Sequence, residues 1–356
     1  MQDRLIFLIG SPRSGSTLLS RVMGAHSKIY APEEPHLITP IAHLGYYDNV
    51  ESAAYDPVIT RQAARTLVAA LPRGESEYLD ALRAYTDAIY RGLFESQTNS
   101  PLASEPSSTT SKIGPNHSYL LDKTPAYALS LDFLVRLYPE ARYVVLTRNP
   151  IAVWSSFVDS FFDGDDGAAH AHNPLLERYV PAIARFLQTS PVPFYHARYE
   201  ELVQSPDEEA RKICDFLEIE FESEMVDYGS SPGARGESTR GLGDPIGVAQ
   251  QSRPTTRSLS KWVTAATGKP ERVRLYQEIL ARLSDEDLAS WKTSRAELSA
   301  EIDKIDLGGR PAPRPRLTRY ALERRVLVSV RRRIQPENGL GRLVKRIREV
   351  CDVLLR

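Results

Sequence analysis

A glycine-flanked loop near the start of the chain joins an apolar run to a helical pattern, and this junction constrains the fold most strongly. Residues 5–9 (Leu-Ile-Phe-Leu-Ile) form a continuous apolar run, which is typical of a parallel strand buried on both faces. The loop from Gly10 to Gly15 interrupts this run, and residues 16–25 then carry apolar side chains at helical spacing. A glycine-rich loop between a strand and a helix N-terminus predicts an anion-binding site.

The same alternation of strand and helix recurs along the chain. Residues 143–147 predict a second buried strand, and 149–150 (Asn-Pro) have the composition of a helix start. A helix is expected over 125–138, and a third strand over 192–196. The next helix begins at 205–208 (Ser-Pro-Asp-Glu), which has the pattern of a capping box. Alternating strands and helices favour an α/β fold with a central parallel sheet flanked by helices, with its site at the carboxyl ends of the strands.

The loop is close to a nucleotide-binding P-loop but lacks its lysine. Ser16 stands where the pattern G-x-x-x-x-G-K-[ST] has lysine, and Arg13 supplies positive charge earlier in the loop. Without that lysine the loop does not favour triphosphate chemistry or a required metal. An ATP- or GTP-dependent kinase would also need an acidic metal ligand after a strand, and Arg148 follows residues 143–147 instead. An ordinary strand–helix turn is the alternative reading of this loop.

Residues 12–17 (Pro-Arg-Ser-Gly-Ser-Thr), placed after an apolar strand, resemble the sulfotransferases that use 3′-phosphoadenosine 5′-phosphosulfate (PAPS). The resemblance implies a three-layer, P-loop-like sulfotransferase fold and an enzyme that moves a sulfonyl group from PAPS to an acceptor hydroxyl. PAP is released, and no metal is implied. The residues that the resemblance assigns to the phosphosulfate are Arg13, Ser14, Gly15, Ser16 and Thr17.

Residues 31–37 (Ala-Pro-Glu-Glu-Pro-His-Leu) are similar to two patterns in this family. One is the G-E-E-T-R of tyrosylprotein sulfotransferases, and the other is the A-P-P-E-L-H-L of sulfotransferase domains in polyketide assembly lines. Both patterns place the general base at Glu34, and the second also matches His36. Nearby Arg13 and Lys123 would keep Glu34 ionised, whereas a histidine has an ordinary pKa of about 6.5, nearer neutral pH. Glu34 is preferred, with His36 as its partner or the alternative base.

Three further motifs follow in the order that the family has them. Residues 121–125 (Leu-Asp-Lys-Thr-Pro) resemble the element whose lysine, here Lys123, assists the leaving group together with Arg13. Arg148 and Ser156 match the pair that binds the 3′-phosphate of the donor. Tyr199 matches a tyrosine beside the adenosine, and Lys261, in 258–262 (Ser-Leu-Ser-Lys-Trp), matches a cofactor ligand. The resemblance extends from residue 5 to about residue 265.

Composition and charge divide the chain into two parts. We expect a sulfotransferase domain over 1–308, with a helical insertion at about 37–120, and a basic, Pro/Arg-rich helical tail over 309–356. Arg and Lys nearly balance Asp and Glu overall, with a net charge of −1, so nothing indicates a nucleic-acid partner. Residues 310–356 alone carry a net charge of +10. The tail could contact its own acidic domain, an anionic membrane surface or an acidic carrier protein.

The acceptor is the least constrained part of the function. The candidates are a hydroxyl of a small molecule, a lipid or a carrier-bound metabolite, which would suit secondary metabolism. The chain has two cysteines and neither a signal-peptide pattern nor an apolar stretch of membrane-spanning length, which indicates a cytoplasmic protein without a transmembrane segment. A homodimer and a non-catalytic nucleotide-binding scaffold are left open.

Overall fold

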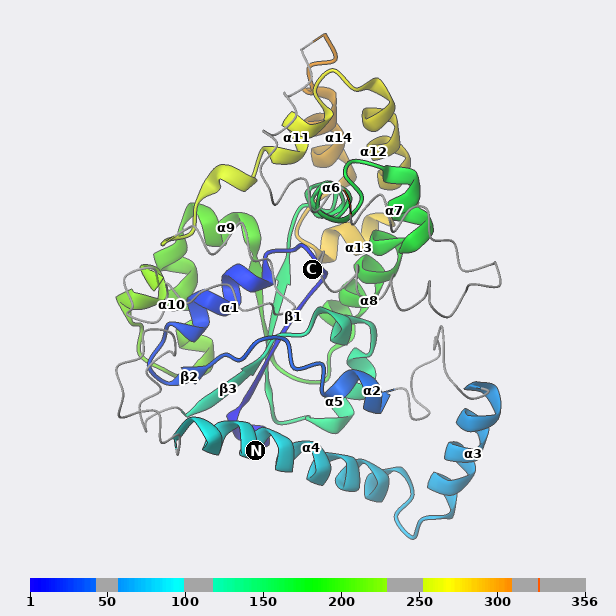
Figure 1. Cartoon of the computed structure of the whole chain (residues 1–356), viewed down its shortest axis with the longest axis vertical. Coiled ribbons are helices and arrows are strands. Elements are labelled where there is room, and N and C mark those ends of the chain that lie inside the picture. The colour runs from blue at the N-terminus through cyan, green and yellow to red at the C-terminus, as the bar shows by residue number, and fades with distance from the viewer. Residues whose placement is uncertain (43–56, 99–117, 229–251, 309–325, 327–356) are drawn as a thin grey trace.

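A five-stranded parallel sheet forms the centre of the protein (Figure 1). The computed structural model describes residues 1–42, 57–98, 118–228, 252–308 and 326. The strands are β1 (Leu5–Gly10), β2 (Ile29–Tyr30), β3 (Tyr119–Asp122), β4 (Arg142–Thr147) and β5 (Phe194–Arg198). Their order is β2-β3-β1-β4-β5, and every pairing is parallel. The predicted α/β fold with a central parallel sheet is therefore confirmed.

Strand β1 shows why the sheet is covered on both faces. All six of its residues are buried, and successive side chains point to opposite faces of a strand. Phe7 and Ile9 pack into one hydrophobic core, whereas Ile6 and Leu8 pack into another. Two cores on opposite faces of one strand require a helical layer on each side, which gives the three layers.

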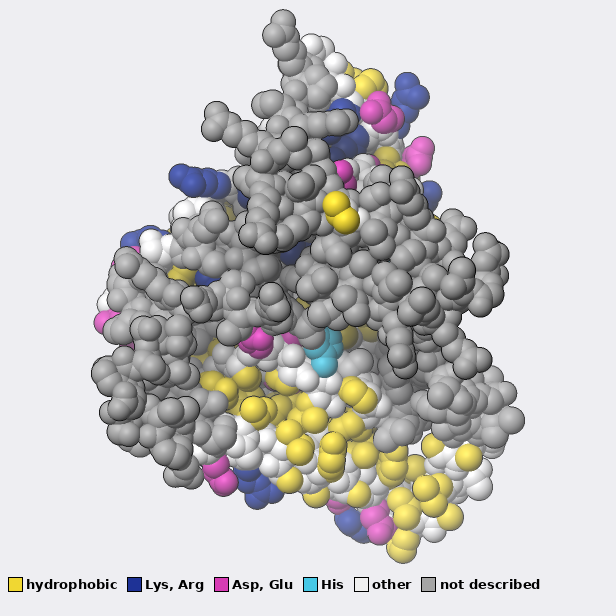
Figure 2. Space-filling view, viewed as in Figure 1, with side chains coloured by type: hydrophobic (Ala, Val, Ile, Leu, Met, Phe, Trp, Pro, Cys, Tyr) yellow, Lys and Arg dark blue, Asp and Glu magenta, His cyan; other side chains and the backbone are white. Residues whose placement is uncertain are grey.

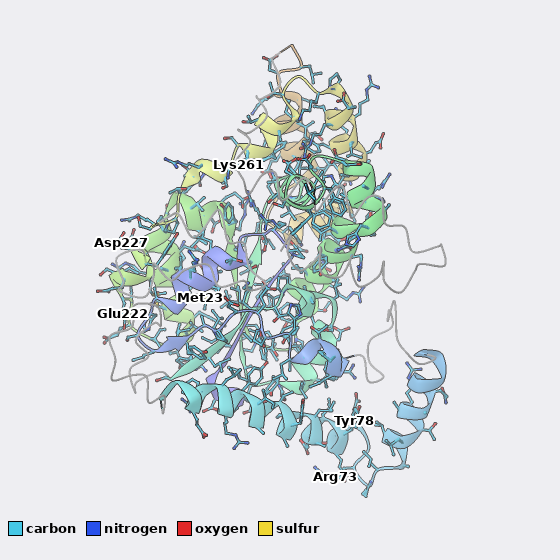
Figure 3. The ribbon with its side chains drawn as sticks, viewed as in Figure 1. Met23, Arg73, Tyr78, Glu222, Asp227 and Lys261 are labelled. Carbon is cyan, nitrogen blue, oxygen red and sulfur yellow. The ribbon has the colours of Figure 1, made fainter. Side chains whose placement is uncertain are left out.

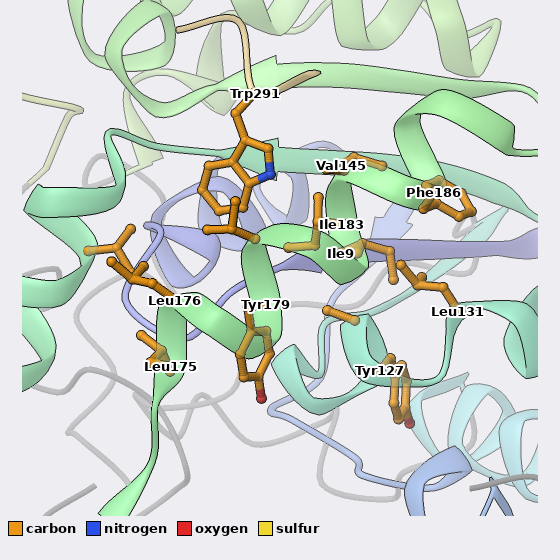
Figure 4. Close-up of a cluster of buried hydrophobic side chains, with 14 of the residues drawn as sticks. Ile9, Tyr127, Leu131, Val145, Leu175, Leu176, Tyr179, Ile183, Phe186 and Trp291 are labelled. Atoms are coloured by element: carbon orange, nitrogen blue, oxygen red, sulfur yellow. The ribbon is translucent and has the colours of Figure 1, made fainter. Parts of the chain in front are cut away.

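One layer consists of α1 (Ser16–Gly24), α9 (Tyr199–Gln204) and α10 (Pro206–Leu217). The other layer contains the 3-10 helix η3 (Pro125–Leu129), α5 (Leu131–Leu137) and α8 (Leu175–Thr189). In this second core Ile9, Val145, Ile183 and Phe186 lie together with Trp291 from the C-terminal helices (Figure 4). The two cores bury both faces of the sheet, so the strand ends that carry the loops of the site are held in fixed positions.

The remaining helices pack at two ends of the sheet. Above the strands in Figure 1 lie α6 (Pro150–Phe161), α7 (Asp166–His172), α11 (Lys261–Ala266), α12 (Pro270–Arg282) and α14 (Arg295–Asp303), whereas α13 (Asp285–Ser290) packs against α8. Below the strands are α2 (Ile38–Ala42), α3 (Pro57–Ala70) and the long α4 (Glu75–Thr98). Three further 3-10 helices are η1 (Gln2–Arg4), η4 (Ser223–Met225) and η6 (Thr256–Ser258).

Helix α4 faces the core on one side and solvent on the other. Tyr90 and Thr86 are fully buried, and the Thr86 hydroxyl bonds the Tyr138 hydroxyl of the core. Tyr85 and Ile89 are exposed on the same helix, and hydrophobic side chains gather where α4 lies on the face shown in Figure 2. None of the described helices is long and apolar enough to cross a membrane.

Comparison with the sequence predictions gives three corrections. The strands expected at 5–9, 143–147 and 192–196 are β1, β4 and β5, but β2 and β3 were not predicted. The helix expected over 125–138 is divided into η3 and α5 by Ser130, whose φ of −134° is not helical. Helix α10 begins at Pro206 as expected, but the predicted capping box is wrong. The Ser205 side chain bonds none of the described helix amides, and its ψ of 63° lies outside the extended region that caps adopt.

The predicted basic tail, 309–356, lies outside the described residues apart from Val326. The structure therefore leaves the boundary at residue 308, the helical content of the tail and its contacts as predictions.

Candidate active site

The loop after β1 has the geometry of an anion cradle, and its two glycines are required by close contacts. A Cβ on Gly10 would lie 2.8 Å from Ser14 Oγ, and one on Gly15 would lie 2.4 Å from Cδ2 of Tyr199. Gly15 also has a φ of 98°, and Arg13 adopts a left-handed φ of 69°. A side chain at either glycine would therefore displace the loop, which explains the glycine-flanked pattern.

Unpartnered donors line this loop and the start of α1. Gly15 precedes α1, and no described side chain caps the first turn of this nine-residue helix. The hydroxyls of Ser11 and Ser14 are buried without a hydrogen-bond partner among the described residues. Buried polar atoms normally find partners, so these hydroxyls and the helix amides fit a bound anionic group such as a phosphosulfate.

The carboxyl end of β3 brings a lysine to the carboxylate expected to act as base. Lys123 Nζ lies 2.5 Å from Glu34 Oε1 and 3.5 Å from Thr17 Oγ1 of α1. Only 5% of the Lys123 side chain and 13% of the Glu34 side chain are exposed. His36 Nε2 lies 3.4 Å from Glu34 Oε2, within ion-pair distance but outside hydrogen-bond geometry. The structure thus brings Lys123, 89 positions away in sequence, to Glu34 and His36 beside the phosphate loop.

The charge state of Glu34 follows from these neighbours. Burial alone raises the pKa of Glu34, but His36 and Lys123 favour the charged form more strongly, so its pKa is lowered below the ordinary value. Glu34 is therefore a carboxylate throughout the neutral range. It can accept a proton at any physiological pH, although its basicity is reduced by the same neighbours.

A second cluster forms where β4 ends. The Arg148 guanidinium donates from Nη1 to the Arg13 carbonyl at 3.2 Å and from Nη2 to the Ser258 carbonyl at 3.0 Å. It also lies 4.1 Å from the centre of the Tyr199 ring. Arg13 Nε donates to Ser156 Oγ at 3.2 Å. Arg148, Ser156 and Tyr199, predicted to bind the 3′-phosphate and adenosine of the donor, therefore neighbour Arg13, predicted to bind its phosphosulfate.

Arg148 is also poised to bind a further anion. The residue is 9% exposed, and its Nε atom is buried without a partner in the described part of the chain. Burial lowers the pKa of Arg148, with Tyr199 and Glu200 opposing that effect, but an arginine stays protonated in proteins. A buried guanidinium whose nearest described contacts are carbonyls and an aromatic face fits a phosphate as its counter-ion.

The first backbone amides of the helix after Arg148 are already bound by side chains in the described part of the chain. Asn149 caps α6 by accepting bonds from the amides of Ile151 and Ala152 at 2.9 and 3.1 Å. Its own amide donates to Glu200 Oε1 at 2.9 Å. The helix start predicted from residues 149–150 is thus confirmed, and Glu200 is a supporting residue that the sequence analysis did not identify.

Lys261 stands apart from these two clusters. It is an exposed residue at the start of α11 (Figure 3), three positions after Ser258, whose carbonyl binds Arg148. Lys261 is therefore linked to the Arg148 cluster only by its short spacing from Ser258 along the chain, and its role as a cofactor ligand remains a prediction. Among the residues described, no group of three or more His, Cys, Asp or Glu side chains is arranged to hold a metal ion.

A family model described as the Sulfotransferase family matches residues 5–223, more than half of the chain. The chain belongs to this family. It is 29% identical over 230 residues to the nodulation protein NoeE of Sinorhizobium fredii, covering 59% of this chain and 48% of that protein. A putative protein-tyrosine sulfotransferase of Caenorhabditis briggsae is 23% identical, covering 73% of this chain and 81% of that protein.

Solved sulfotransferase structures are also similar to this chain. A sulfotransferase domain from the curacin biosynthetic pathway gives a TM-score of 0.45 at 22% identity, covering 77% of this chain and 96% of that domain. Mouse sulfotransferase SULT7A1 complexed with PAP gives 0.41 at 15% identity, covering 82% of this chain and 88% of that structure. This sulfotransferase spans about half or less of the length of the first two curated relatives that it matches.

Proposed function

We propose that this sulfotransferase moves the sulfonyl group of PAPS to an acceptor hydroxyl and releases PAP. The observation that carries the proposal is the position of Lys123, which lies 2.5 Å from the carboxylate of Glu34 and 3.5 Å from Thr17. A base, a cation for the leaving group and a phosphate loop are thereby within reach of one reacting centre. Sulfonyl transfer needs these three elements and no covalent intermediate.

Each group then has a defined task in an in-line displacement at sulfur. The phosphate loop and the start of α1 bind the phosphosulfate through the Ser11 and Ser14 hydroxyls and backbone amides. A bond forms between the acceptor oxygen and sulfur while the bond between sulfur and the bridging oxygen breaks. Lys123 and Arg13 stabilise the charge on that oxygen, a contribution worth about 10²–10³ in rate for one such group. Glu34 takes the acceptor proton, with His36 beside it.

The short Glu34–Lys123 contact implies a rearrangement during turnover. Lys123 cannot neutralise both Glu34 and the departing oxygen at full strength, because one ammonium group is shared between two anions. As charge grows on the bridging oxygen, Lys123 shifts toward it and Glu34 becomes a stronger base. The contact thus links loss of the leaving group to uptake of the acceptor proton.

The Arg148 cluster supplies recognition of the donor. Arg148 and Ser156 would bind the 3′-phosphate, with Tyr199 beside the adenosine and Lys261 as a further ligand. A charge-assisted hydrogen bond is worth about 1.5–3 kcal/mol, so this cluster would separate PAPS from nucleotides without a 3′-phosphate. The acceptor is proposed only as a hydroxyl compound: a small molecule, a lipid or a carrier-bound metabolite.

Thermal stabilisation by nucleotides tests this proposal. A ligand at a hundred times its Kd stabilises a protein by about 2.7 kcal/mol, so PAP should raise Tm clearly, and AMP or ATP much less, with or without magnesium. Arg148→Ala should abolish the preference for PAP. Arg142→Ala is the matched control, because it removes the same charge from the opposite end of β4, where Arg142 bonds the Asp3 carbonyl at 2.8 Å. Equal stabilisation by magnesium-ATP and PAP would favour a kinase, and no stabilisation by any nucleotide would contradict the proposal.

A further inference from the structure

Asp122, the last residue of β3, is a fully buried carboxylate beside the site. Three hydroxyls donate to it. Tyr90 of α4 bonds Oδ2 at 2.6 Å, Tyr127 of η3 bonds the same oxygen at 3.0 Å, and Thr124 bonds Oδ1 at 2.9 Å. Burial raises the pKa of Asp122, and these hydrogen bonds oppose the rise. A carboxyl group placed at full burial, with three donors from α4 and from the segment around η3, indicates a role beyond filling space.

Two of the three hydroxyls also bind the segment that carries the proposed base. Tyr127 accepts a hydrogen bond from the Ile38 amide at 3.0 Å, and Thr124 accepts one from the His36 amide at 3.3 Å. A hydroxyl has one proton. Each hydroxyl donates this proton in its hydrogen bond to Asp122. The lone pairs of the two hydroxyl oxygens are then left to accept from the amides of His36 and Ile38.

The backbone of His36 shows why this segment needs such support. Its φ of 50° lies in the left-handed region, which is uncommon for residues other than glycine and is retained where the surroundings enforce it. The bond from the His36 amide to Thr124 acts at that residue. Lys123 directly follows Asp122 in the chain, so the same carboxylate anchors the backbone that presents the lysine to Glu34.

We propose that Asp122 is a positioning residue that holds the Glu34–His36 segment in register with Lys123 through the hydroxyls of Thr124 and Tyr127. The positioning is a property of the fold, whereas its effect on turnover rests on the proposed function. The proposal predicts that hydroxyls bridging Asp122 to the segment matter for turnover, whereas Tyr90, which bonds Asp122 from α4, matters for stability.

Two tyrosine-to-phenylalanine substitutions separate the positioning role from the stabilising role. Tyr127→Phe and Tyr90→Phe each remove one hydroxyl from Asp122 Oδ2, but only Tyr127 also holds the Ile38 amide. Hydrogen exchange of the Ile38 amide should become at least about tenfold faster in Tyr127→Phe and stay unchanged in Tyr90→Phe. Equal exchange in the two variants would overturn the proposal, whatever reaction the protein performs.

Turnover gives the second readout, measured as PAP released from PAPS with a panel of phenols and primary alcohols. Thr124→Val should lower kcat by about 10–100-fold with the KM for PAPS unchanged, because a misplaced base costs rate rather than donor affinity. Thr124→Ser keeps the hydroxyl and should restore kcat. If Tyr127→Phe fails to fold, the comparison of Thr124→Val with Thr124→Ser still tests the positioning role of Asp122.

The outcomes distinguish this inference from the proposed function. Wild-type protein that neither binds PAP nor turns over PAPS would contradict the proposed function, while the exchange measurement would still judge the role of Asp122. Wild-type turnover with equal kcat in Thr124→Val and Thr124→Ser would leave the proposed function intact and overturn the inference.

Discussion

Replacing Glu34 with glutamine should separate the chemical step from donor binding. Glutamine keeps the shape and an oxygen that can accept a hydrogen bond from Lys123, but it cannot take a proton from the acceptor. A positioned base contributes roughly 10²–10⁴ in rate, so kcat should fall by at least about 100-fold. Lys123 would lose its counter-ion at 2.5 Å, so an anionic ligand such as PAP should bind as tightly as before or more tightly.

The stability of Glu34→Gln follows from the burial of the ion pair. Breaking a buried pair costs about 3–5 kcal/mol, but the amide oxygen retains one bond to Lys123. We therefore expect the unliganded variant to lose about 1–3 kcal/mol, and PAP to recover much of this loss. Glu33→Gln is the matched control, because it makes the same change at the adjacent exposed residue. A Glu34→Gln variant with turnover within about threefold of wild type would exclude Glu34 as the base.

The pH profile decides between Glu34 and His36. The pKa of Glu34 is lowered below its ordinary value by His36 and Lys123, so protonation of Glu34 should reduce kcat only under strongly acidic conditions. The stabilising contribution of the Glu34 charge is likewise present above its unfolded pKa and lost as pH falls through the lower folded pKa. A loss of activity well above the acidic range would count against Glu34, and a fall in kcat of about 100-fold or more in His36→Gln would then assign the proton transfer to the histidine.

Three further substitutions test the phosphate loop, helix α4 and a buried histidine. Gly15→Ala combines a φ of 98° with a Cβ 2.4 Å from the Tyr199 ring, so it should cost at least about 2 kcal/mol and abolish PAP stabilisation. Gly92→Ala in α4, which meets nothing within 4 Å, should raise denaturant stability by about 0.5–1 kcal/mol. Burial lowers the pKa of His196 to about 4 from its ordinary 6.5. The unfolded chain therefore takes up this proton first as pH falls, and stability should decline by up to about 3 kcal/mol between pH 6.5 and 4. In His196→Gln, the free energy of unfolding measured with urea should lack this decline between pH 6.5 and 4.

Two of the three strands that the sequence predicted, β1 and β4, have long apolar runs. β1 and β4 are buried over almost their whole length, so their residues are apolar without interruption. β2 has two residues and β3 has four, which is too short for a periodic pattern to appear. Yet these two strands carry the site. The contact between Lys123 and Glu34, which are 89 positions apart, depends on β3 lying beside β2.

Short sequence motifs predicted which residues belong to the site, but not which of these residues contact one another. Glu34, Lys123 and Arg148 were identified from short patterns, and the structure brings Glu34 and Lys123 together while Arg148 meets Arg13 and Ser258. The role of Asp122 was hidden, although it lies within the same motif as Lys123. Thr124 and Tyr127 follow Asp122 closely in the chain, but Tyr90 comes from α4, so only the fold shows that the three hydroxyls converge.

Transfer of radiolabelled sulfur from PAPS tests the proposed reaction. Purified protein would be incubated with labelled PAPS and a panel of phenols, primary alcohols and hydroxyacyl thioesters, with EDTA present throughout. We predict that the label moves to a hydroxyl compound while PAP appears in equal amount, and that Lys123→Met lowers the rate by about 10²–10³. No transfer to any acceptor, combined with magnesium-dependent phosphorylation of the same panel by ATP, would contradict sulfonyl transfer as the activity of this chain.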